Sequence, residues 1–316
     1  MRILVTGGAG FIGSHLCEAL QHEGHEVIAL DNLSTGRREN LPSSIPLYEI
    51  DLRNPSALQE FFATHTFEVI FHLAAQVDVR TSVEAPRTDA EINILGTLNL
   101  ISAAAPQKPW VIFASTGGAI YGEKAVLPIS EEVCPEPEAP YGIAKLAGEL
   151  YGSRLMKLYG GTWTTLRLAN VYGPRQNPFG EAGVVAIFTY RLLKGEIPHI
   201  YGDGLQTRDF TYVSDVVQAF LRVLRHPDTT QGQTFNVGTG QQTSVLELYH
   251  AIAQAVGVSH PPKHLPPKPG ELRHNALSYH KLYKATGWQP QIPLSQGIAQ
   301  TIAFFRELQR SSMPPQ

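Results

Sequence analysis

A tyrosine and a lysine four residues apart have the types and spacing that proton-transfer chemistry needs. Tyr141 and Lys145 open a stretch, running to about Tyr159, whose pattern predicts a helix. Positions i and i+4 of a helix lie on one face. A cation held near a phenol favours its ionised form, and an ionised tyrosine can act as a base near neutral pH. An ordinary exposed i,i+4 pair is the alternative interpretation.

Two hydroxyl side chains precede this pair in the sequence. Ser115 and Thr116 follow the apolar run from Trp110 to Ala114, which predicts a buried strand. This strand is therefore expected to end in two hydroxyl residues, at the edge of the sheet where ligands bind. Their position, together with the dinucleotide-binding unit at the start of the chain, favours a catalytic role for the tyrosine over the ordinary helical pair.

The first 31 residues have the pattern of a dinucleotide-binding βαβ unit. An apolar strand, Arg2 to Thr6, leads into Gly7, Gly10 and Gly13, and after a helix a second strand ends at Asp31. These glycines permit a tight turn, close approach of a pyrophosphate and close packing of the helix. The helix N-terminus attracts phosphates. Asp31 is placed to accept from the adenosine ribose hydroxyls and would repel a 2′-phosphate, so we expect NAD rather than NADP.

Two observations keep other interpretations open at this unit. A glycine turn can serve packing alone, without a ligand. In addition, Arg37 and Arg38 follow the acidic residue closely, and they could bind a 2′-phosphate if their loop folded back.

Three further strands extend the expected sheet. They are predicted at Pro46 to Asp51, Val69 to Ala75 and Trp110 to Ala114, with helices at Ser56 to Thr64 and Ala90 to Ala105. Five strands alternating with helices predict an α/β fold, a doubly wound parallel Rossmann sheet whose ligands bind at the carboxyl ends of the strands. Asp51 and Leu52 could then contact an adenine, and the small residues of Leu73-Ala74-Ala75 allow backbone to pass near a cofactor.

The second half of the chain loses this regular alternation. We expect an NAD-binding domain at 1–173, with a return segment at about 207–226, and a smaller C-terminal α/β substrate domain at 174–316. Its predicted elements are a helix at Val184 to Lys194, a strand at Ile197 to Tyr201, a strand and helix at Phe210 to Arg225, a turn at Phe235 to Gly240, a closing helix at Leu294 to Gln309 and a frayed end at Ser311 to Gln316.

Composition excludes several classes of function. A net charge of −3 and no basic run beyond Arg37-Arg38 argue against nucleic acid or a membrane surface as a partner. Two cysteines without disulfide or metal spacing suggest a reducing compartment, and the chain starts on a core strand with no signal peptide, so a cytoplasmic location is expected. No apolar run has membrane-spanning length, and the spacing of the histidines predicts no metal site.

Motifs along almost the whole chain resemble one known family. The chain is similar to the extended short-chain dehydrogenase/reductases and, among them, to the UDP-glucose 4-epimerases. The resemblance rests on Thr6 to Gly13, Asp31-Asn32, Asp51-Leu52, His72 to Ala75, Asn93, Tyr141 to Lys145, Leu166 to Pro174 and Arg208-Asp209-Phe210.

The resemblance implies a site for NAD and a site for a UDP-sugar. Implied cofactor contacts are Gly7, Gly10, Phe11, Ile12, Gly13, Asp31, Asn32, Asp51, Leu52, Leu73, Ala74, Ala75, Asn93, Tyr141 and Lys145. Implied substrate contacts are Gln76, Asn170, Val184, His199, Tyr201, Arg208, Lys268, Glu271 and Asn275. Among these, Tyr201 would lie beside the uracil, Arg208 and Lys268 would hold the diphosphate, Glu271 would take the uridine ribose, and Asn275 would set the size of the sugar pocket.

The implied reaction inverts C4 of a UDP-hexose, UDP-glucose or UDP-galactose, without net redox change. Tyr141 takes the proton of the 4-hydroxyl while hydride leaves C4 for NAD, the 4-keto sugar turns over, and both return to the other face. UDP-N-acetylglucosamine or UDP-glucuronate as substrate, a dehydrogenase or reductase of the same fold, and a dinucleotide-sensing module are the alternatives. The helices near Asn93 to Ala105 and Tyr141 to Tyr159 are implied to pair in a homodimer.

Two departures from the family pattern concern the site. Many such epimerases carry Ser or Thr where this chain has Gly117, so the hydrogen bond to the sugar hydroxyl must come from Thr116, Ser115 or water. Related dehydratases have an Asp-Glu pair after this strand, and related decarboxylases tend to have a Glu there. Gly117-Gly118 argues against both reactions, since expulsion of water needs an acid and a base.

Overall fold

The computed structural model describes residues 1–124, 126–179, 183–267 and 272–311. Its centre is a seven-stranded, wholly parallel sheet in the order β11-β6-β5-β4-β1-β2-β3. The strands are β1 (Arg2–Thr6), β2 (Glu26–Asp31), β3 (Leu47–Glu49), β4 (Val69–His72), β5 (Trp110–Thr116), β6 (Thr162–Leu168) and β11 (Thr234–Val237). This confirms the predicted doubly wound Rossmann sheet.

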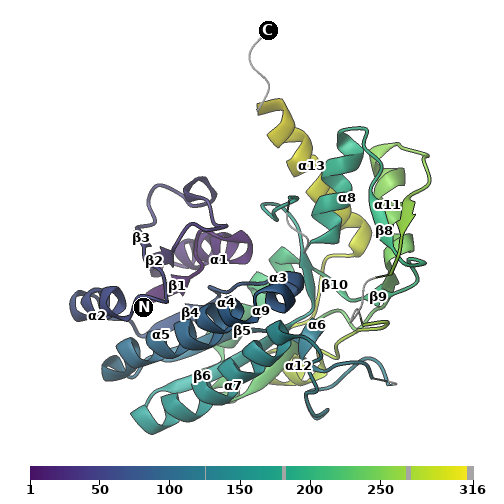
Figure 1. The fold of residues 1–316 in the computed structure, drawn as a ribbon. Coiled ribbons are helices and arrows are strands. Elements are labelled where there is room, and N and C mark those ends of the chain that lie inside the picture. Colours follow the sequence, from purple (N-terminus) through teal and green to yellow (C-terminus); the bar gives the residue numbers. More distant parts are fainter. Residues whose placement is uncertain (125, 180–182, 268–271, 312–316) are drawn as a thin grey trace.

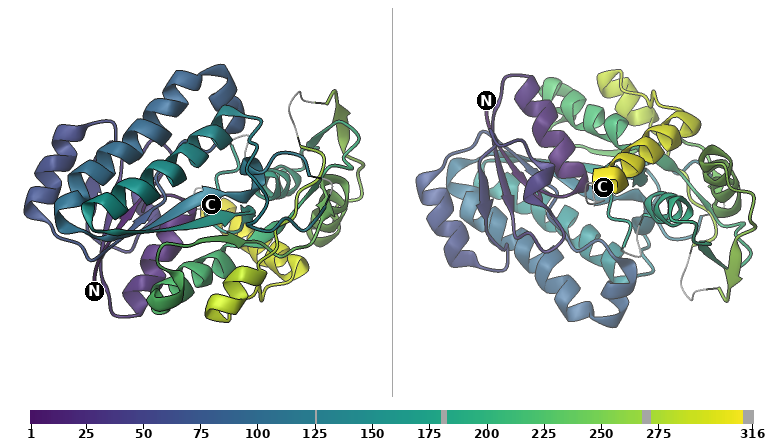
Figure 2. Two further views of the ribbon diagram at one scale, coloured as in Figure 1. Left: turned by 90° about the horizontal axis from the view of Figure 1, so that it is seen from below. Right: turned by 90° about the horizontal axis from the view of Figure 1, so that it is seen from above.

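Helices cover both faces of this sheet (Figure 2). One face carries α1 (Phe11–His22), α9 (Val213–Arg225), α10 (Pro227–Thr230) and α12 (His280–Thr286), and the other carries α2 (Pro55–Thr64), α5 (Gly96–Ala104) and α7 (Pro140–Tyr159). Because successive strand residues face opposite sides, Ile3 and Val5 pack in the core with α1 and α9, while Leu4 packs in the core with α2 and α5.

Two strands of the sheet were absent from the sequence-based prediction. β6 contains three threonines and Arg167, so it does not look apolar, yet all its residues except Thr162 are buried. Its polar groups are bonded inside the protein: Trp110 Nε1 of β5 donates to Thr164 Oγ1 at 2.9 Å, and Thr164 Oγ1 donates to the Thr230 carbonyl of α10 at 2.9 Å. The first three residues of the turn expected at Phe235 to Gly240 belong instead to β11, which pairs with β6.

The helix expected from Ala90 to Ala105 is a composite. α3 (Val79–Glu84) and α4 (Pro86–Ala90) lead into the π-helical turn η2 (Glu91–Leu95), then α5, then the short 3-10 turn η3 (Ala105–Gln107). π-helical turns within helices occur often at functional sites. Two further short helices, η1 (Arg38–Asn40) and α6 (Gly117–Ile120), follow β2 and β5.

A second lobe lies beyond the carboxyl ends of the strands (Figure 1). Its helices α8 (Val184–Leu193), α11 (Val245–Val256) and α13 (Leu294–Ser311) pack around one apolar cluster. Short strands pair as β7 (Asn170–Tyr172) with β10 (Phe210–Tyr212), β8 (His199–Tyr201) with β13 (Lys263–Leu265), and β9 (Thr207–Arg208) with β12 (Thr243–Ser244). Ser244 caps α11, its hydroxyl accepting from the Glu247 N–H at 3.1 Å.

The chain crosses between the two lobes more often than expected. α9 packs on α1, β11 forms an edge of the central sheet, and α12 packs on β11. We therefore propose that the first domain extends beyond the expected return segment at 207–226 and includes β11 and α12.

Within the ranges that the structure describes, no helix has both the length and the apolar character needed to cross a membrane. Nor do three or more His, Cys, Asp or Glu side chains of the described ranges gather where a metal ion could be held.

Candidate active site

The strand order of the central sheet reverses between β1 and β4, which places a ligand crevice at their carboxyl ends. Gly7 follows β1 with φ +69°, and a β-carbon on it would lie 2.7 Å from the Ala74 nitrogen. A β-carbon on Gly13 would lie 2.1 Å from the Gly7 carbonyl oxygen. Backbone at the turn therefore packs closer than side chains would allow.

The helix that follows this turn offers its N-terminus to a ligand. α1 begins at Phe11 after Gly10, and within the described chain no side chain caps it. Its first N–H groups and the positive end of its dipole form an anion site. The glycine cradle and the uncapped helix fit the pyrophosphate of a dinucleotide.

Asp31, the acidic residue expected to meet the adenosine ribose, lies at the end of β2 and is buried. Its carboxylate accepts from the backbone N–H of Ala9 at 3.0 Å and of Leu33 at 2.9 Å. Burial raises its pKa, and these N–H groups oppose that shift. The carboxylate is thus tied to the glycine turn, with lone pairs left for a ribose.

Of the two basic residues after Asp31, Arg38 is arranged differently from what a phosphate site requires. The Arg37 N–H donates to the Ala9 carbonyl at 3.0 Å, so the loop does fold back on the glycine turn. The Arg38 guanidinium, however, donates to the carbonyls of Pro42 and Ile45, both at 3.4 Å. Arg38 therefore points into its own loop.

Asp51 and Leu52, the expected adenine contacts, lie after β3. The Asp51 carboxylate accepts from the Arg53 guanidinium at 2.7 and 3.0 Å and from Asn32 Nδ2 at 2.9 Å. These donors hold the pKa of Asp51 well below its usual range. Leu52 is buried against Gly96. Asn32 and Asp51 thus form one unit, whose contact with adenine stays a prediction.

The segment after β4 is held from two sides. Its Leu73 and Ala74 N–H groups donate to the carbonyl and hydroxyl oxygens of Thr6, at 3.1 and 3.3 Å. Asn93 accepts from the Gln76 N–H at 3.0 Å and donates to the Gln76 carbonyl at 2.9 Å. Ala75 lies between these anchors, so the backbone that is expected to face the cofactor is fixed by hydrogen bonds within the protein.

Gln76, expected to contact the substrate, uses both of its side-chain N–H groups inside the protein. They donate to the Asp78 carbonyl at 2.8 Å and to Asp89 Oδ1 at 2.9 Å. Its Oε1 accepts from the Asp78 N–H. A substrate contact by this side chain stays a prediction, and it could use only the remaining lone pair of Oε1.

Tyr141 and Lys145 lie on the first turns of α7, beside the end of β5. Lys145 is buried, with Nζ 4.6 Å from the centroid of the Phe113 ring. Burial lowers the pKa of Lys145 to about 8, although the carboxylates of Asp89 and Glu149 raise it. Burial raises the pKa of Tyr141, and Asp89 adds to this shift. This is opposite to the direction expected from Lys145, because desolvation of the phenol is the largest cause of the shift.

The two candidate hydroxyls have different partners. The Thr116 hydroxyl lies near enough to the phenol of Tyr141 to oppose the rise of its pKa. Ser115 instead donates to Glu149 Oε1 at 2.5 Å. A β-carbon on Gly117 would lie 2.2 Å from Leu277 Cδ1. A serine there would point into the apolar cluster around Leu277, and the geometry favours Thr116 as the hydroxyl beside the base.

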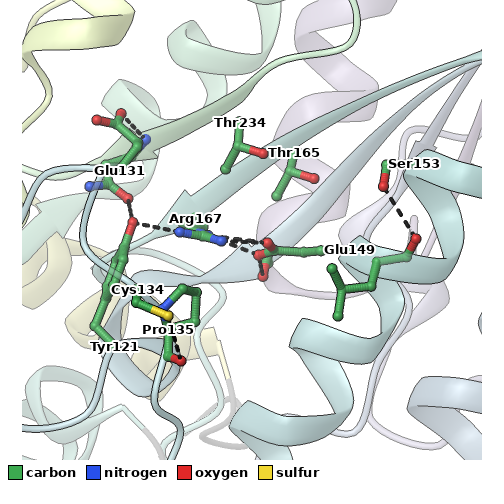
Figure 3. A network of polar contacts seen from close by, with 12 residues as sticks. Tyr121, Glu131, Cys134, Pro135, Glu149, Ser153, Thr165, Arg167 and Thr234 are labelled. Carbon is green, nitrogen blue, oxygen red and sulfur yellow. Dashed lines mark hydrogen bonds and ion pairs between the residues drawn. The ribbon is translucent and has the colours of Figure 1, made fainter.

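A buried ion pair next to this site was missed by sequence reasoning (Figure 3). The Arg167 guanidinium donates to both oxygens of Glu149, at 2.7 to 3.2 Å, and to the Tyr121 hydroxyl at 2.8 Å. The Tyr121 hydroxyl in turn donates to Asn236 Oδ1 at 2.8 Å. The network joins α7, β6 and β11. The i,i+4 spacing of Lys145 and Glu149 would have predicted a pair between these two residues, and no local pattern indicates Arg167 as the partner.

The candidate substrate residues lie on several segments of the second lobe and the adjoining loops. Val184 begins α8, and His199 and Tyr201 begin and end β8, with the Arg80 guanidinium of α3 5.4 Å from the Tyr201 ring centroid. Arg208 ends β9; one carboxylate that could have paired with it, Asp203, is bound by Arg273 at 2.8 Å. Lys268 and Glu271 lie outside the described residues.

Two asparagine side chains converge on the Gly117-Gly118 turn. Asn275 Nδ2 donates to the Gly117 carbonyl at 3.2 Å, and a β-carbon on Gly118 would lie 3.5 Å from Asn170 Oδ1. Within the described chain, Oδ1 of both residues is buried without a hydrogen-bond partner. Buried acceptors that lack a donor suit a hydroxylated ligand.

Comparisons with known proteins agree with this geometry. Residues 3–238 match the model of the NAD dependent epimerase/dehydratase family. The chain is 46% identical to a UDP-glucose 4-epimerase of Mycolicibacterium smegmatis, over 97% of this chain and 99% of the relative. It is 45% identical to the Thermotoga maritima UDP-glucose 4-epimerase crystallised with UDP-glucose, with a TM-score of 0.95 over 98% and 100% of the two chains. It is 44% identical to the Thermus thermophilus UDP-glucose 4-epimerase, whose structure is a complex with NAD. The TM-score is 0.91, and the comparison covers 97% of this chain and 99% of the other. The chain therefore belongs to the NAD dependent epimerase/dehydratase family.

Proposed function

We propose that this protein interconverts UDP-glucose and UDP-galactose by inverting C4 of the hexose. The observation that carries the proposal is the position of Tyr141 and the buried Lys145, one turn apart on α7 and beside Ser115 and Thr116 at the end of β5. This end of the sheet also holds the dinucleotide cradle at Gly7 and Gly13. A base and a hydride carrier that act on one carbon are the two parts that the reaction needs.

The chain's own residues move the proton. NAD, when bound, supplies the hydride acceptor and donor at C4 and a positive charge near the phenol. Tyr141 takes the proton of the 4-hydroxyl, with the Thr116 hydroxyl positioned between them as a relay. Lys145, an ammonium below its pKa of about 8, favours the phenolate. After the 4-keto sugar has turned over, Tyr141 returns the proton on the opposite face.

The residues after β5 favour epimerisation over elimination. Gly117 and Gly118 provide neither the acid nor the base that loss of water requires. The free acceptors of Asn170 and Asn275 can instead receive sugar hydroxyls in either C4 configuration. Tight binding of the UDP part and loose contacts to the sugar would permit the turnover.

The test is to incubate purified protein with UDP-glucose labelled with deuterium at C4, without added NAD, and to identify the sugar nucleotides. We expect UDP-galactose that keeps the deuterium at C4, with NAD still bound after dialysis. UDP-N-acetylglucosamine and UDP-glucuronate are run in parallel, and Tyr141→Phe is the inactive control. Recovery of unchanged UDP-glucose contradicts the hexose assignment, and loss of NAD on dialysis supports a dehydrogenase.

A homodimer through α7 is part of the same proposal. Ile143, Leu150, Tyr151 and Leu158 of α7 are 49% to 78% exposed and share one helix face, and Leu95 of the neighbouring helix is 51% exposed. An apolar stripe of this extent marks an interface. Light scattering should give a dimer for the wild type and a monomer for Leu150→Lys/Leu158→Lys. A wild-type monomer, or a double variant that stays dimeric, contradicts this interface.

We also propose a cytoplasmic location, supported by Cys17 and Cys134, which are both free thiols.

A further inference from the structure

The carboxylate of Asp209 is fully buried and has no part in the mechanism above. Asp209 lies between β9 and β10, directly after Arg208, and is 0% exposed. Carboxylates are rarely buried this completely unless they are paired, because burial penalises the charge. The donors that replace water here are backbone N–H groups and a hydroxyl. We therefore asked which segments of the chain this carboxylate fixes.

Asp209 binds two segments that are distant from it in the sequence. Its Oδ1 accepts from the Thr239 N–H at 2.9 Å and from the Thr239 hydroxyl at 2.6 Å. Its Oδ2 accepts from the Gly240 N–H at 3.0 Å and from the Leu277 N–H at 3.1 Å. Every one of these partners is a donor, which suits an ionised carboxylate. Asp209 thus joins the turn after β11 to the segment that follows Asn275.

The segment around Leu277 is held from both sides. On one side, the Ile129 N–H donates to the Ala276 carbonyl and the Ser278 N–H donates to the Ile129 carbonyl, both at 2.8 Å. The Leu277 N–H between these two bonds is the one that Asp209 accepts. The carboxylate therefore fixes this segment on the side that Ile129 leaves open.

The same segment carries a sugar-pocket residue, Asn275. Asn275 is 0% exposed, and its Nδ2 donates to the Gly117 carbonyl at 3.2 Å. Leu277 packs directly on Gly117, since a β-carbon there would lie 2.2 Å from Leu277 Cδ1. Across the Gly117 turn, the Asn170 N–H donates to the Asp209 carbonyl at 2.9 Å. Within the described chain, Oδ1 of Asn275 has no hydrogen-bond partner, so its position decides where a sugar hydroxyl can be received.

We propose that Asp209 is a positioning residue that places the free acceptor of Asn275 in the sugar pocket. Its carboxylate holds the Leu277 N–H, and this contact fixes the segment that presents Asn275 beside Gly117. The UDP part does not depend on it, because Arg208, the expected diphosphate ligand, is held on β9 by pairing with β12. The inference rests on the proposed function only for the sugar that meets Asn275.

The first test compares the affinities of NAD-loaded Asp209→Ala for UDP-glucose and for UDP. Calorimetric titrations are made in a Tyr141→Phe background, which does not turn the sugar over. Asp209→Ala removes the acceptor of the Leu277 N–H, so UDP-glucose should bind about fivefold more weakly, the effect of one lost hydrogen bond. The Kd of UDP should stay the same. Equal weakening of both ligands, or of neither, overturns the inference.

Asp215→Ala is the matched control. Asp215 is 4% exposed on α9, and its carboxylate accepts from the Ile292 N–H at 3.0 Å. It is thus another buried carboxylate that fixes a backbone N–H from a distant segment. We expect Asp215→Ala to unfold at lower urea concentration while its affinities for both ligands stay unchanged. If Asp209→Ala shows only this loss of stability, it has no positioning role.

A second variant perturbs the same contact and keeps the charge, which covers the case that Asp209→Ala does not fold. A β-carbon on Gly238 would lie 2.6 Å from Asp209 Oδ2 and 2.9 Å from Leu277 Cβ. Gly238→Ala therefore forces the carboxylate and Leu277 apart. We expect the same selective loss of affinity for UDP-glucose, and an affinity equal to that of the parent overturns the inference.

A double-mutant cycle tests whether Asp209 acts through Asn275. In an Asn275→Ala background the acceptor is gone, so Asp209→Ala should weaken UDP-glucose binding by less than about twofold. The same cost in both backgrounds overturns the inference. These titrations need no turnover. A selective loss in Asp209→Ala, combined with a wild type that shows no epimerisation, supports the inference and contradicts only the proposed function.

Discussion

Two buried charged sites lie one helical turn apart on α7, and they are compensated in opposite ways. Glu149 is bound bidentately by Arg167, which also donates to Tyr121, so each charge has a partner of opposite sign. Lys145 has the Phe113 ring as its close neighbour, and burial lowers its pKa to about 8. A balanced pair fixes α7 against the sheet, whereas an unbalanced charge can gain or lose a proton near neutral pH. Glu149, with a structural role, and Lys145, with a proposed role in proton transfer, are thus only about 6 Å apart along the helix axis, since the rise is about 1.5 Å per residue.

The largest expected effect compares two tyrosines, one from each site. Tyr141→Phe should lower kcat by about 10²–10⁴-fold, since it removes the base, while unfolding stays close to that of the wild type. Tyr121→Phe should leave kcat nearly unchanged but cost about 1–3 kcal/mol, because Arg167 and Asn236 lose a buried partner. Steady-state kinetics and urea unfolding measure both. Equal losses of kcat in the two variants would abolish the distinction.

The ion pair itself gives the next effect. Arg167→Met should destabilise the protein by about 3–5 kcal/mol, because Glu149 is left buried without its partner. The double variant Glu149→Leu/Arg167→Met should recover most of this loss, since neither charge remains. Urea unfolding of the NAD-loaded proteins is the measurement. A double variant less stable than Arg167→Met would show that the network contributes more than charge balance.

The pH dependence of stability should mark Lys145 as the unbalanced charge. Its folded pKa of about 8 lies below the ordinary value of 10.5, so between these values the unfolded chain binds more protons and stability rises with pH. Relative to Lys145→Met, the wild type should gain up to about 3 kcal/mol across this range. The Arg167→Met difference should stay flat over the same range. A flat Lys145 difference would mean that the ammonium is as well compensated as the guanidinium.

The smallest effect separates the neighbouring hydroxyls at the end of β5. Thr116→Val should lower kcat about tenfold, because it removes the hydroxyl that lowers the pKa of Tyr141. Ser115→Ala should cost about 1–2 kcal/mol of stability through the lost bond to Glu149, with kcat near that of the wild type. If Ser115→Ala instead lowered kcat and Thr116→Val lowered only stability, Ser115 would be the hydroxyl that takes part in the reaction and Thr116 would have the structural role.

Local sequence patterns were sufficient to predict the parts of the fold that have a regular period. The βαβ unit, the parallel sheet and the helix that begins near Tyr141 follow from apolar periodicity and glycine spacing. The pattern failed at β6 and β11, whose threonines, arginine and asparagine are buried only because partners elsewhere in the chain bond them. Periodicity carries no information about such distant partners.

The sequence alone determined which side chains could do chemistry: Tyr141, Lys145, the hydroxyls of Ser115 and Thr116, and an acid at the end of the second strand. Only the tertiary structure decided how they are used. It bonded Ser115 to Glu149, left Thr116 as the hydroxyl that lowers the pKa of Tyr141, and filled the space beside Gly117 with Leu277. The physical reason is that residue type fixes what a group can donate, accept or ionise. Burial and neighbours from distant segments fix its pKa and its free lone pairs.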